Sequence, residues 1–291
     1  MGTRWSSVCY LPAGCSAAAA EAGLARAVAT VDAQMSTWKP HTALMKLNRA
    51  PIGDWCAVPD ELMHVLSTAL EIGAASGGLF DISVLPHVQA WGFGPSGTPA
   101  PTPPPARPLG APIELDPHGR ARRVLDVGLD LSGIAKGFAV DLMARALEQQ
   151  GIVDFLVSID GEVQAAGCHP DGRPWQVGLE APDFERRGVL GAIALADCAL
   201  ATSGDYRHRR AHGAGWVSHT IDPRTGQPAN NRLASVTVRM THCMPADAWA
   251  TALLVAGETE GPRLAAARQL DAIFLLRAAD ALTTIGTGSF Q

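Results

Sequence analysis

The sequence predicts an α+β protein in which helices flank a mostly antiparallel sheet. Two observations predict this class. Segments of helical periodicity occur early, in the middle and late in the chain, and short apolar or alternating runs between turn residues fill residues 152–276. The composition agrees, because 47% of the 291 residues are apolar and 18% are charged, as in folded domains with a sizeable core. The length suits one large domain or two ordinary ones.

The first half of the chain is predicted to hold two helices followed by a loop. Apolar residues recur at helical spacing within Ala17–Met35, which indicates a helix with one packed face. A second helix begins at Pro59, where proline fits the first turn, and ends before Gly77. Residues 95–112 contain eight prolines and no apolar period, so they predict an exposed, semi-rigid loop.

The second half is predicted to contain both strands and helices. Val124–Leu131 has a strand pattern, and Ile134–Gln150 has a helical pattern that Gly151 terminates. Two further helices, Pro245–Ala256 and Gly261–Leu270, lie near the end of the chain. Short runs bounded by Gly, Pro and Asp predict the other strands: Ile152–Ile159, Trp175–Leu179, Val189–Leu195, Trp216–Ile221, Leu233–Met240 and Ala272–Leu276.

Composition and missing motifs exclude several functions. The 23 Lys and Arg against 28 Asp and Glu give a net charge of −5, which argues against a nucleic-acid-binding surface. No apolar run approaches the ~20 residues that span a membrane. The six cysteines are scattered, as in proteins of a reducing compartment. The apolar core of a secretory leader does not precede Leu11–Cys15, so a cytoplasmic protein is expected. Gly-rich phosphate loops, serine-hydrolase elbows and zinc-protease motifs are missing.

The first motif that can carry chemistry is Asp130–Gly137, between a predicted strand and a predicted helix. Gly133 allows the backbone to approach a ligand closely, and Lys136 adds a positive charge. The free N–H groups at the start of a helix can also bind an anion such as a phosphate. A capped helix start that packs on a sheet explains the same residues without a ligand.

The second motif is the pair Asp247 and Thr251, which are four residues apart and therefore share one face near the start of a helix. A carboxylate and a hydroxyl, completed by waters and phosphate oxygens, form a suitable partial shell for Mg²⁺. The structural alternative is an Asp at the positive end of the helix dipole and a Thr in the core.

The third motif is Ser218–Gly226, a strand end that enters a turn. Its Asp-Pro and Thr-Gly pairs are ordinary turn residues. The imidazole of His219 has an unperturbed pKa of ~6.5, which suits a general base. A single His at the end of a strand is also a common structural residue, so both interpretations stay open.

Two tryptophans complete the set of candidates. Trp38 follows the first predicted helix, and Trp91 begins the segment Trp91–Gly94, where glycines allow close approach to a flat ring. Packing in the core or under a lid is the alternative for each side chain.

Together these segments resemble the ApbE family, the FAD:protein FMN transferases. The resemblance extends over essentially the whole chain, so residues 1–291 are expected to form a single ApbE-like domain with a T-fold-like architecture. Its specificity lies in the order of the motifs: Met1–Trp5, Met35–Trp38, Ser76–Asp81, Trp91–Gly94, Asp130–Gly137, Thr202–Tyr206, Ser218–Gly226 and Ala246–Thr251.

The resemblance implies an enzyme that binds FAD and, with Mg²⁺, transfers the FMN half to a Thr or Ser hydroxyl of a partner flavoprotein, releasing AMP. The metal would be held by Asp247, Thr251 and the backbone carbonyl of Gly133. His219 would be the catalytic base, and Asp247 would be catalytic through the metal. The implied FAD contacts are Met1, Trp38, Leu79, Phe80, Asp81, Asp130, Lys136 and Ile221.

The resemblance leaves some alternatives open. The same site also fits an FAD pyrophosphatase that uses water as the acceptor, or a non-catalytic protein that binds and delivers FAD. The protein is expected to be a monomer or a homodimer. One turn departs from the family pattern, because Asp160 stands where a second glycine is expected before Glu162. Position 136 also varies between an acid and Lys in the family.

Overall fold

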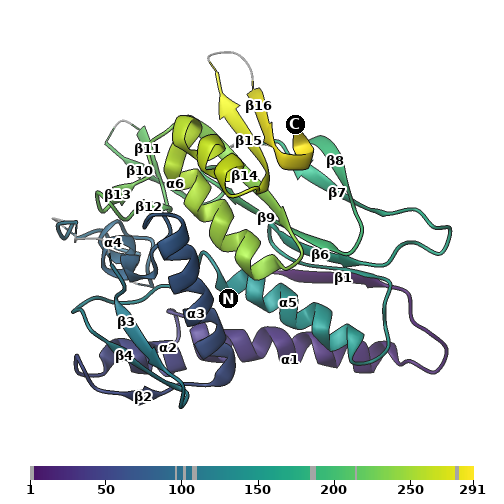
Figure 1. Ribbon diagram of the computed structural model, residues 1–291, viewed down its shortest axis with the longest axis horizontal. Helices are drawn as coiled ribbons and strands as arrows, with labels where there is room; N and C mark the ends of the chain where they lie inside the picture. Colours follow the sequence, from purple (N-terminus) through teal and green to yellow (C-terminus); the bar gives the residue numbers. More distant parts are fainter. Residues whose placement is uncertain are drawn as a thin grey trace.

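A seven-stranded sheet forms the centre of the computed structural model (Figure 1). The structure describes residues 3–95, 97–100, 103–106, 110–183, 188–213, 215–278 and 282–291. Neighbouring strands of the sheet are antiparallel throughout. The predicted α+β class is therefore confirmed. In spatial order the strands are β1 (Trp5–Cys9), β5 (Phe155–Ile159), β6 (Glu162–Ala166), β9 (Cys198–Gly204), β14 (Leu233–Met240), β15 (Asp271–Arg277) and β16 (Leu282–Thr287).

Long helices pack on one face of this sheet and against one another (Figure 1). The main apolar core lies between them and the strands, and its fully buried side chains include Phe138, Phe155 and Phe274. Burial of each ring stabilises the fold by about 2–3 kcal/mol relative to exposure. The long helices are α1 (Ala17–Met35), α3 (Asp60–Ala75), α5 (Ala135–Glu148) and α6 (Cys243–Ala267).

The opposite face of the sheet is covered by a hairpin of β7 (Trp175–Glu180) and β8 (Val189–Leu195). Side chains alternate along β9: Ala199 and Ala201 belong to the main core under the helices, whereas Leu200 packs in a second apolar cluster with the hairpin. The same alternation turns Ser203 toward the helices, a point on which the candidate site depends.

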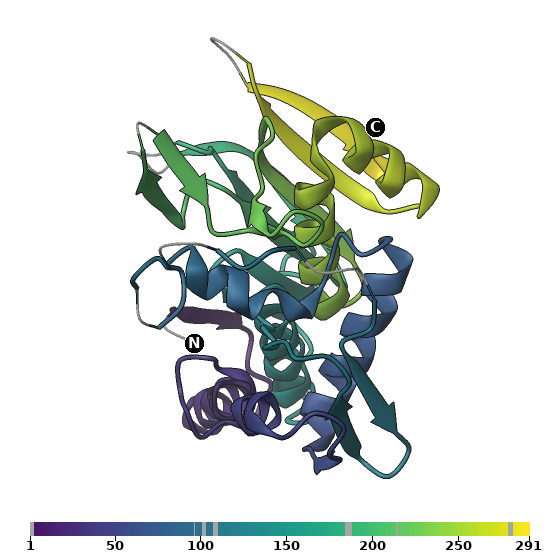
Figure 2. The ribbon, with the colours of Figure 1, turned by 90° about the vertical axis from the view of Figure 1, so that its left-hand side faces the viewer.

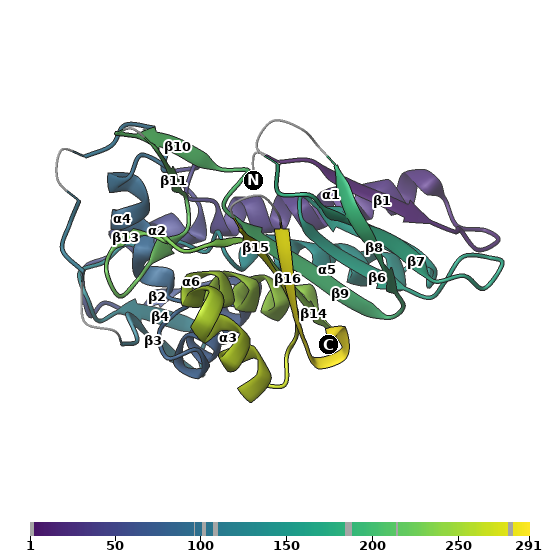
Figure 3. The ribbon, with the colours of Figure 1, turned by 90° about the horizontal axis from the view of Figure 1, so that it is seen from above.

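Smaller elements gather at one end of the molecule. Seen from above, α4 (Leu85–Ala90) and the strands β10 to β13, which lie between Arg209 and Pro228, are at this end, and the β7–β8 hairpin is at the other (Figure 3). The side view places α4 beside the same strands (Figure 2). The remaining elements are α2 (Ala43–Arg49), η1 (Ile82–Val84), α4 (Leu85–Ala90), β2 (Cys56–Ala57), β3 (Ile113–Asp116), β4 (Arg120–Arg123), β10 (Arg209–His212), β11 (Gly215–Ser218), β12 (Ile221–Asp222), β13 (Gln227–Pro228) and η2 (Gly288–Phe290).

The strand predicted at Val124–Leu131 is wrong. β4 ends at Arg123, and the chain from there to α5 contains no strand. Side chains replace a neighbouring strand here, because Asn48 Nδ2 donates to the carbonyl of Leu129 at 2.9 Å and Asn48 Oδ1 accepts from Leu129 N at 2.8 Å. The apolar pattern therefore reflects burial of an irregular segment whose backbone polar groups are satisfied by an amide side chain.

The C-terminal helices differ from expectation in detail, whereas the described part of the Pro-rich segment is a loop as predicted. The two helices predicted at 245–256 and 261–270 form the single run α6, which ends at Ala267, three residues earlier than predicted, and is interrupted at Gly257, where φ is 77° and ψ is −177°. The described part of residues 95–112 contains no helix or strand, and residues 96, 101, 102 and 107–109 lie outside the described residues. Within the described ranges, every helix is too short or too polar to cross a membrane.

Candidate active site

Two of the predicted motifs meet near the N-terminal ends of α5 and α6. The N–H of Gly137 donates a hydrogen bond of 3.0 Å to Asp247 Oδ2. Gly133, which precedes α5, lies against Thr251, since a Cβ atom at Gly133 would be 3.0 Å from Thr251 Oγ1. That hydroxyl shares a hydrogen bond of 3.0 Å with Ser203 of β9. The structure thus brings together the three residues expected to hold the metal.

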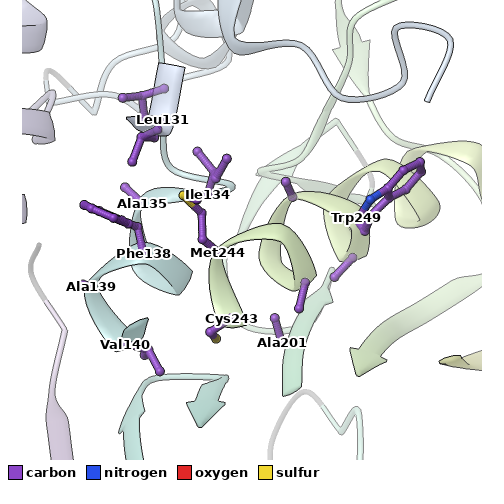
Figure 4. Packing of buried hydrophobic residues seen from close by; sticks show 14 of the residues in the cluster. Leu131, Ile134, Ala135, Phe138, Ala139, Val140, Ala201, Cys243, Met244 and Trp249 are labelled. Atoms are coloured by element: carbon purple, nitrogen blue, oxygen red, sulfur yellow. The ribbon is translucent and has the colours of Figure 1, made fainter. Parts of the chain in front are cut away.

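Glycine at position 137 is what allows α5 and α6 to approach this closely. A Cβ atom at Gly137 would lie 2.5 Å from the carbonyl oxygen of Cys243 and 2.8 Å from Asp247 Cβ. Around this contact, side chains of both helices, including Phe138 and Met244, pack in one apolar cluster (Figure 4). The close approach places the Asp247 carboxylate against the first turn of α5.

A carboxylate of α5 also caps α6. Asp141 Oδ1 accepts a hydrogen bond from Cys243 N at 2.7 Å, and Oδ2 accepts one from Met244 N at 2.9 Å. The residue at the N-cap position itself, His242, makes no side-chain capping bond. Asp141 therefore satisfies N–H groups that a helix start otherwise leaves unpaired, and it ties the two helices of the site together.

Replacing Asp141 with Ala is expected to lower the free energy of unfolding by about 1–2 kcal/mol, because two backbone N–H groups lose their acceptor. Urea denaturation at pH 7 measures this change. Asp141→Asn retains one acceptor oxygen and should lose less. If Asp141→Ala were as stable as the parent, these two hydrogen bonds would contribute nothing to the free energy of unfolding.

The Asp247 carboxylate is buried, with 2% of the residue exposed, and one of its oxygens is available. Burial raises its pKa, while Lys136 and the Gly137 N–H act in the opposite direction. Oδ2 accepts the bond from Gly137, whereas Oδ1 makes no hydrogen bond to any residue that the structure describes. A cation beside Oδ1 would offset the cost of burying this charge.

The donor atoms around Asp247 fit a hard divalent cation. They comprise a carboxylate, the Thr251 hydroxyl and the backbone of Gly133, all oxygen ligands. No three His, Cys, Asp or Glu side chains cluster as a metal site in the described part of the chain. A set with a single carboxylate falls outside that type of cluster. It suits Mg²⁺, which usually keeps waters and substrate phosphates as its other ligands.

Lys136 extends from α5 to a buried acid on β6. Its Nζ is 2.5 Å from Glu162 Oε1, and 29% of the Lys136 side chain is exposed while Glu162 is fully buried. Burial acts to lower the pKa of Lys136, but the carboxylates of Glu162 and Asp247 outweigh it and raise the pKa above the ordinary value. The Lys136 ammonium therefore stays protonated at neutral pH, next to the candidate metal residues.

His219 follows β11 and is held as a neutral imidazole. Its Nδ1 lies 3.0 Å from the carbonyl oxygen of His208, which can only accept, so Nδ1 carries the proton and Nε2 keeps its lone pair. Burial, the neighbouring His208 and the Lys136 charge lower the pKa of His219 to about 4. At neutral pH the ring is therefore able to accept a proton at Nε2.

The Trp91–Gly94 segment supports the third motif. Trp91 Nε1 donates to the carbonyl of Gly226 at 3.2 Å, and Arg210 Nη1 donates to the carbonyl of Gly92 at 2.9 Å. The ring of Phe93 meets that of His219 edge-on, with centroids 6.3 Å apart. These contacts fix the turn and the histidine relative to α4.

Several of the residues expected to contact FAD lie on two adjoining segments. Asp130 N donates to the carbonyl of Ile82 at 2.7 Å, which joins the segment after α3 to the segment before α5. The side chains of Leu79 and Phe80 are buried in the core, so only their backbone can face a ligand. Asp81 Oδ1 accepts from Ser83 N at 2.8 Å and caps η1.

The other expected FAD contacts are more scattered. Burial raises the pKa of Asp130, while hydrogen bonds from Ser132 oppose this. Ile221 is buried in β12, beside the turn of the third motif. Trp38 is 63% exposed, and its backbone N–H donates to Ser36 Oγ at 3.3 Å. Met1 lies outside the described residues.

Three residues of the site region were not among the sequence candidates. Ser203, Glu162 and Asp141 each contact the site from a different element. Ser203 lies within the Thr202–Tyr206 motif, so its place in that ordered series was a usable signal. No local pattern marks Asp141, whose partners are distant in sequence. Glu162 ends the turn that departs from the family pattern at Asp160, but its partner Lys136 is 26 residues away.

The chain matches the family model of the ApbE family over residues 1–274. An FAD:protein FMN transferase of Vibrio cholerae is 36% identical over 273 residues, which cover 91% of this chain and 82% of that protein. The FAD:protein FMN transferase of Klebsiella pneumoniae is 32% identical over 305 residues, with coverages of 100% and 86%.

Solved structures lead to the same family. The flavin transferase ApbE from Vibrio cholerae superposes with a TM-score of 0.87 at 32% identity, covering 100% of this chain and 95% of that one. The family match, the two relatives and this structure confirm the resemblance inferred from the order of the motifs. The chain belongs to the ApbE family.

Proposed function

We propose that this protein transfers FMN from FAD to a Thr or Ser hydroxyl of a target flavoprotein, releases AMP and requires Mg²⁺. The relatives named FAD:protein FMN transferase support the reaction class. The observation that carries the proposal is the convergence of Gly133, Asp247 and Thr251 beside the protonated Lys136. This combination suits a bound pyrophosphate better than a neutral ligand.

Mg²⁺ would be held by Asp247 Oδ1, Thr251 Oγ1 and the carbonyl oxygen of Gly133. When bound, it would supply positive charge to the pyrophosphate oxygens during transfer. Lys136 would add a second positive charge beside it.

Transfer requires one bond to phosphorus to form and one to break. The acceptor hydroxyl oxygen attacks the FMN-side phosphorus, and the bond from that phosphorus to the bridging oxygen breaks, so its electron pair leaves with AMP. The hydroxyl proton moves to Nε2 of His219, whose Nδ1–H is fixed by His208. Phe93 and His208 limit the motion of the ring through edge contacts.

The proposed FAD contacts line the approach to this centre. The backbone at Leu79 to Asp81 and the carboxyl of Asp130 belong to the adjoining segments beside Gly133. Ile221 adds apolar surface near His219. The exposed ring of Trp38 is proposed to stack on a flat ring of FAD, together with Met1.

A direct assay tests the proposal. The purified protein is incubated with FAD, with and without Mg²⁺, and with a domain that bears an acceptor Thr, while AMP release and acceptor mass are followed together. AMP release matched by an FMN-sized mass gain supports the transferase. AMP without a mass gain indicates an FAD pyrophosphatase, and FAD binding without either signal indicates a carrier.

The pH profile tests the role of His219. Because its pKa lies at about 4, protonation removes the Nε2 lone pair only below that pH. We expect kcat/KM to stay level toward acid and to fall near pH 4, not near the ordinary histidine value of 6.5. His219→Gln should remove this acid limb. An acid limb near 6.5 that depends on His219 would contradict the assignment.

A further inference from the structure

The ion pair between Lys136 and Glu162 links the first turn of α5 to the first residue of β6. β6 begins after a two-residue turn in which Asp160 has a φ of 56°, in the left-handed region that favours glycine. Glu162 therefore enters the sheet directly from this turn, with its side chain on the helix-covered face, next to Lys136.

The buried carboxyl group of Glu162 lowers the stability of the fold. It is fully buried, and burial raises its pKa above the usual glutamate range while Lys136 opposes the shift. One oxygen is paired with Lys136 Nζ, but Oε2 is buried and has no hydrogen-bond partner in the described part of the chain. An apolar residue at this position would stabilise the core more than a carboxyl group of which only one oxygen has a partner.

The partner of Glu162 is a flexible cation. Lys136 is partly exposed and has a four-carbon stem with many rotamers, so without a fixed contact its ammonium would sample many positions. The carboxylates of Asp247 and Asp160 also act on its charge. Glu162 makes the direct contact, at 2.5 Å.

We infer that Glu162 is a positioning residue that holds the Lys136 ammonium over the pyrophosphate site. The inference rests on the proposed function, since it assigns Lys136 to the reacting phosphates. Glu162 does not touch the ligand itself. Its contribution is to order one cation before FAD arrives, so that less reorganisation is needed during transfer.

A double-mutant cycle tests this inference through Glu162→Gln, Lys136→Met and the double variant. Glu162→Gln is expected to lower kcat about 10- to 100-fold, as is typical when a residue that orients an active-site group is lost. The double variant should be no slower than Lys136→Met, because Glu162 acts through Lys136. Glu162→Asp keeps the charge and should recover part of the rate.

The FAD dissociation constant is measured by flavin fluorescence without acceptor. It distinguishes an effect on the position of Lys136 from an effect of the Glu162 charge on FAD binding. Glu162→Gln keeps the shape of the side chain and lacks only the charged form that burial already disfavours, so FAD should bind at least as tightly as before while kcat falls. Asp271→Asn, which breaks the ion pair of β15 with Arg239, is the matched control and should leave kcat unchanged.

Two results would overturn the inference: a kcat of Glu162→Gln within twofold of the parent, or losses that simply add in the double variant. The parent protein is assayed in parallel. If it transfers no FMN to any acceptor, the proposed function fails, whereas a working parent with an unaffected Glu162→Gln variant refutes only the role of Glu162.

Discussion

Replacing Asp247 with Ala is expected to lower FMN transfer by about 10³- to 10⁵-fold, the largest loss of any single change in the site. The variant would lose the only carboxylate of the proposed metal set and the acceptor for Gly137 N–H. Charge stabilisation by a metal supplies several kcal/mol of a phosphoryl-transfer barrier, and each 1.36 kcal/mol is a factor of ten. AMP release and acceptor mass, measured at saturating FAD, give the rate.

The His219→Ala variant provides the comparison. Loss of a general base costs about 10²- to 10⁴-fold, a lower range than that expected for Asp247→Ala, so His219→Ala should be the milder of the two changes. If it proved slower than Asp247→Ala, proton transfer and not charge stabilisation would dominate the barrier, and the ranking of the two roles would be reversed.

Asp247→Asn separates a structural loss from a chemical one. The amide keeps an acceptor for Gly137 N–H but carries no charge, and burial already disfavours the charged carboxylate. This variant should therefore unfold at the same urea concentration as the parent, or a higher one, while it loses Mg²⁺-dependent activity. A stable and fully active Asp247→Asn variant would contradict the metal assignment.

Local sequence patterns correctly predicted the elements that have a clear hydrophobic pattern. α1, β8 and β14 have the predicted bounds, because a helical apolar period marks α1 and a largely apolar run between turn residues marks each strand. β6 and β9 were missed, since the first is Glu-Val-Gln-Ala-Ala and the second is rich in Ala, Ser and Thr. They are strands because they occupy the middle of a sheet, a tertiary effect that outweighs weak β-propensity.

The candidate site likewise contains residues that the sequence predicted and residues that only the fold reveals. The order of motifs selected Gly133, Asp247 and Thr251, which then proved to be neighbours through contacts between α5 and α6. The partners of the residues that support this arrangement cannot be predicted from local sequence. Asp141 is 102 residues from the N–H group of Cys243 that it caps, and Glu162 is 26 residues from Lys136. Only the fold brings such partners together.

Gly137→Ala is expected to disrupt the junction on which the whole site depends. The added Cβ would lie 2.5 Å from the backbone oxygen of Cys243, which cannot move aside as a flexible side chain could, so α5 and α6 must separate. Overpacking of this kind costs about 1–3 kcal/mol of unfolding free energy, more than alanine gains in helix propensity. A shift of about 1 Å between Asp247 and Gly133 would also slow transfer about 10²-fold.

Gly23→Ala in α1 is the matched control for this change. The nearest atom to its added Cβ, at 2.7 Å, is the side-chain amide nitrogen of Gln150, which can rotate away from its hydrogen bond to the Ala146 carbonyl and bond to water instead. Gly23→Ala should therefore gain up to about 1 kcal/mol of stability and keep full activity. Urea denaturation and FMN transfer, both measured on the two variants, decide the matter. If Gly137→Ala were as stable and as active as Gly23→Ala, the close contact of α5 with α6 would be incidental, and the metal residues would have to be positioned by Ser203 and Asp141 instead.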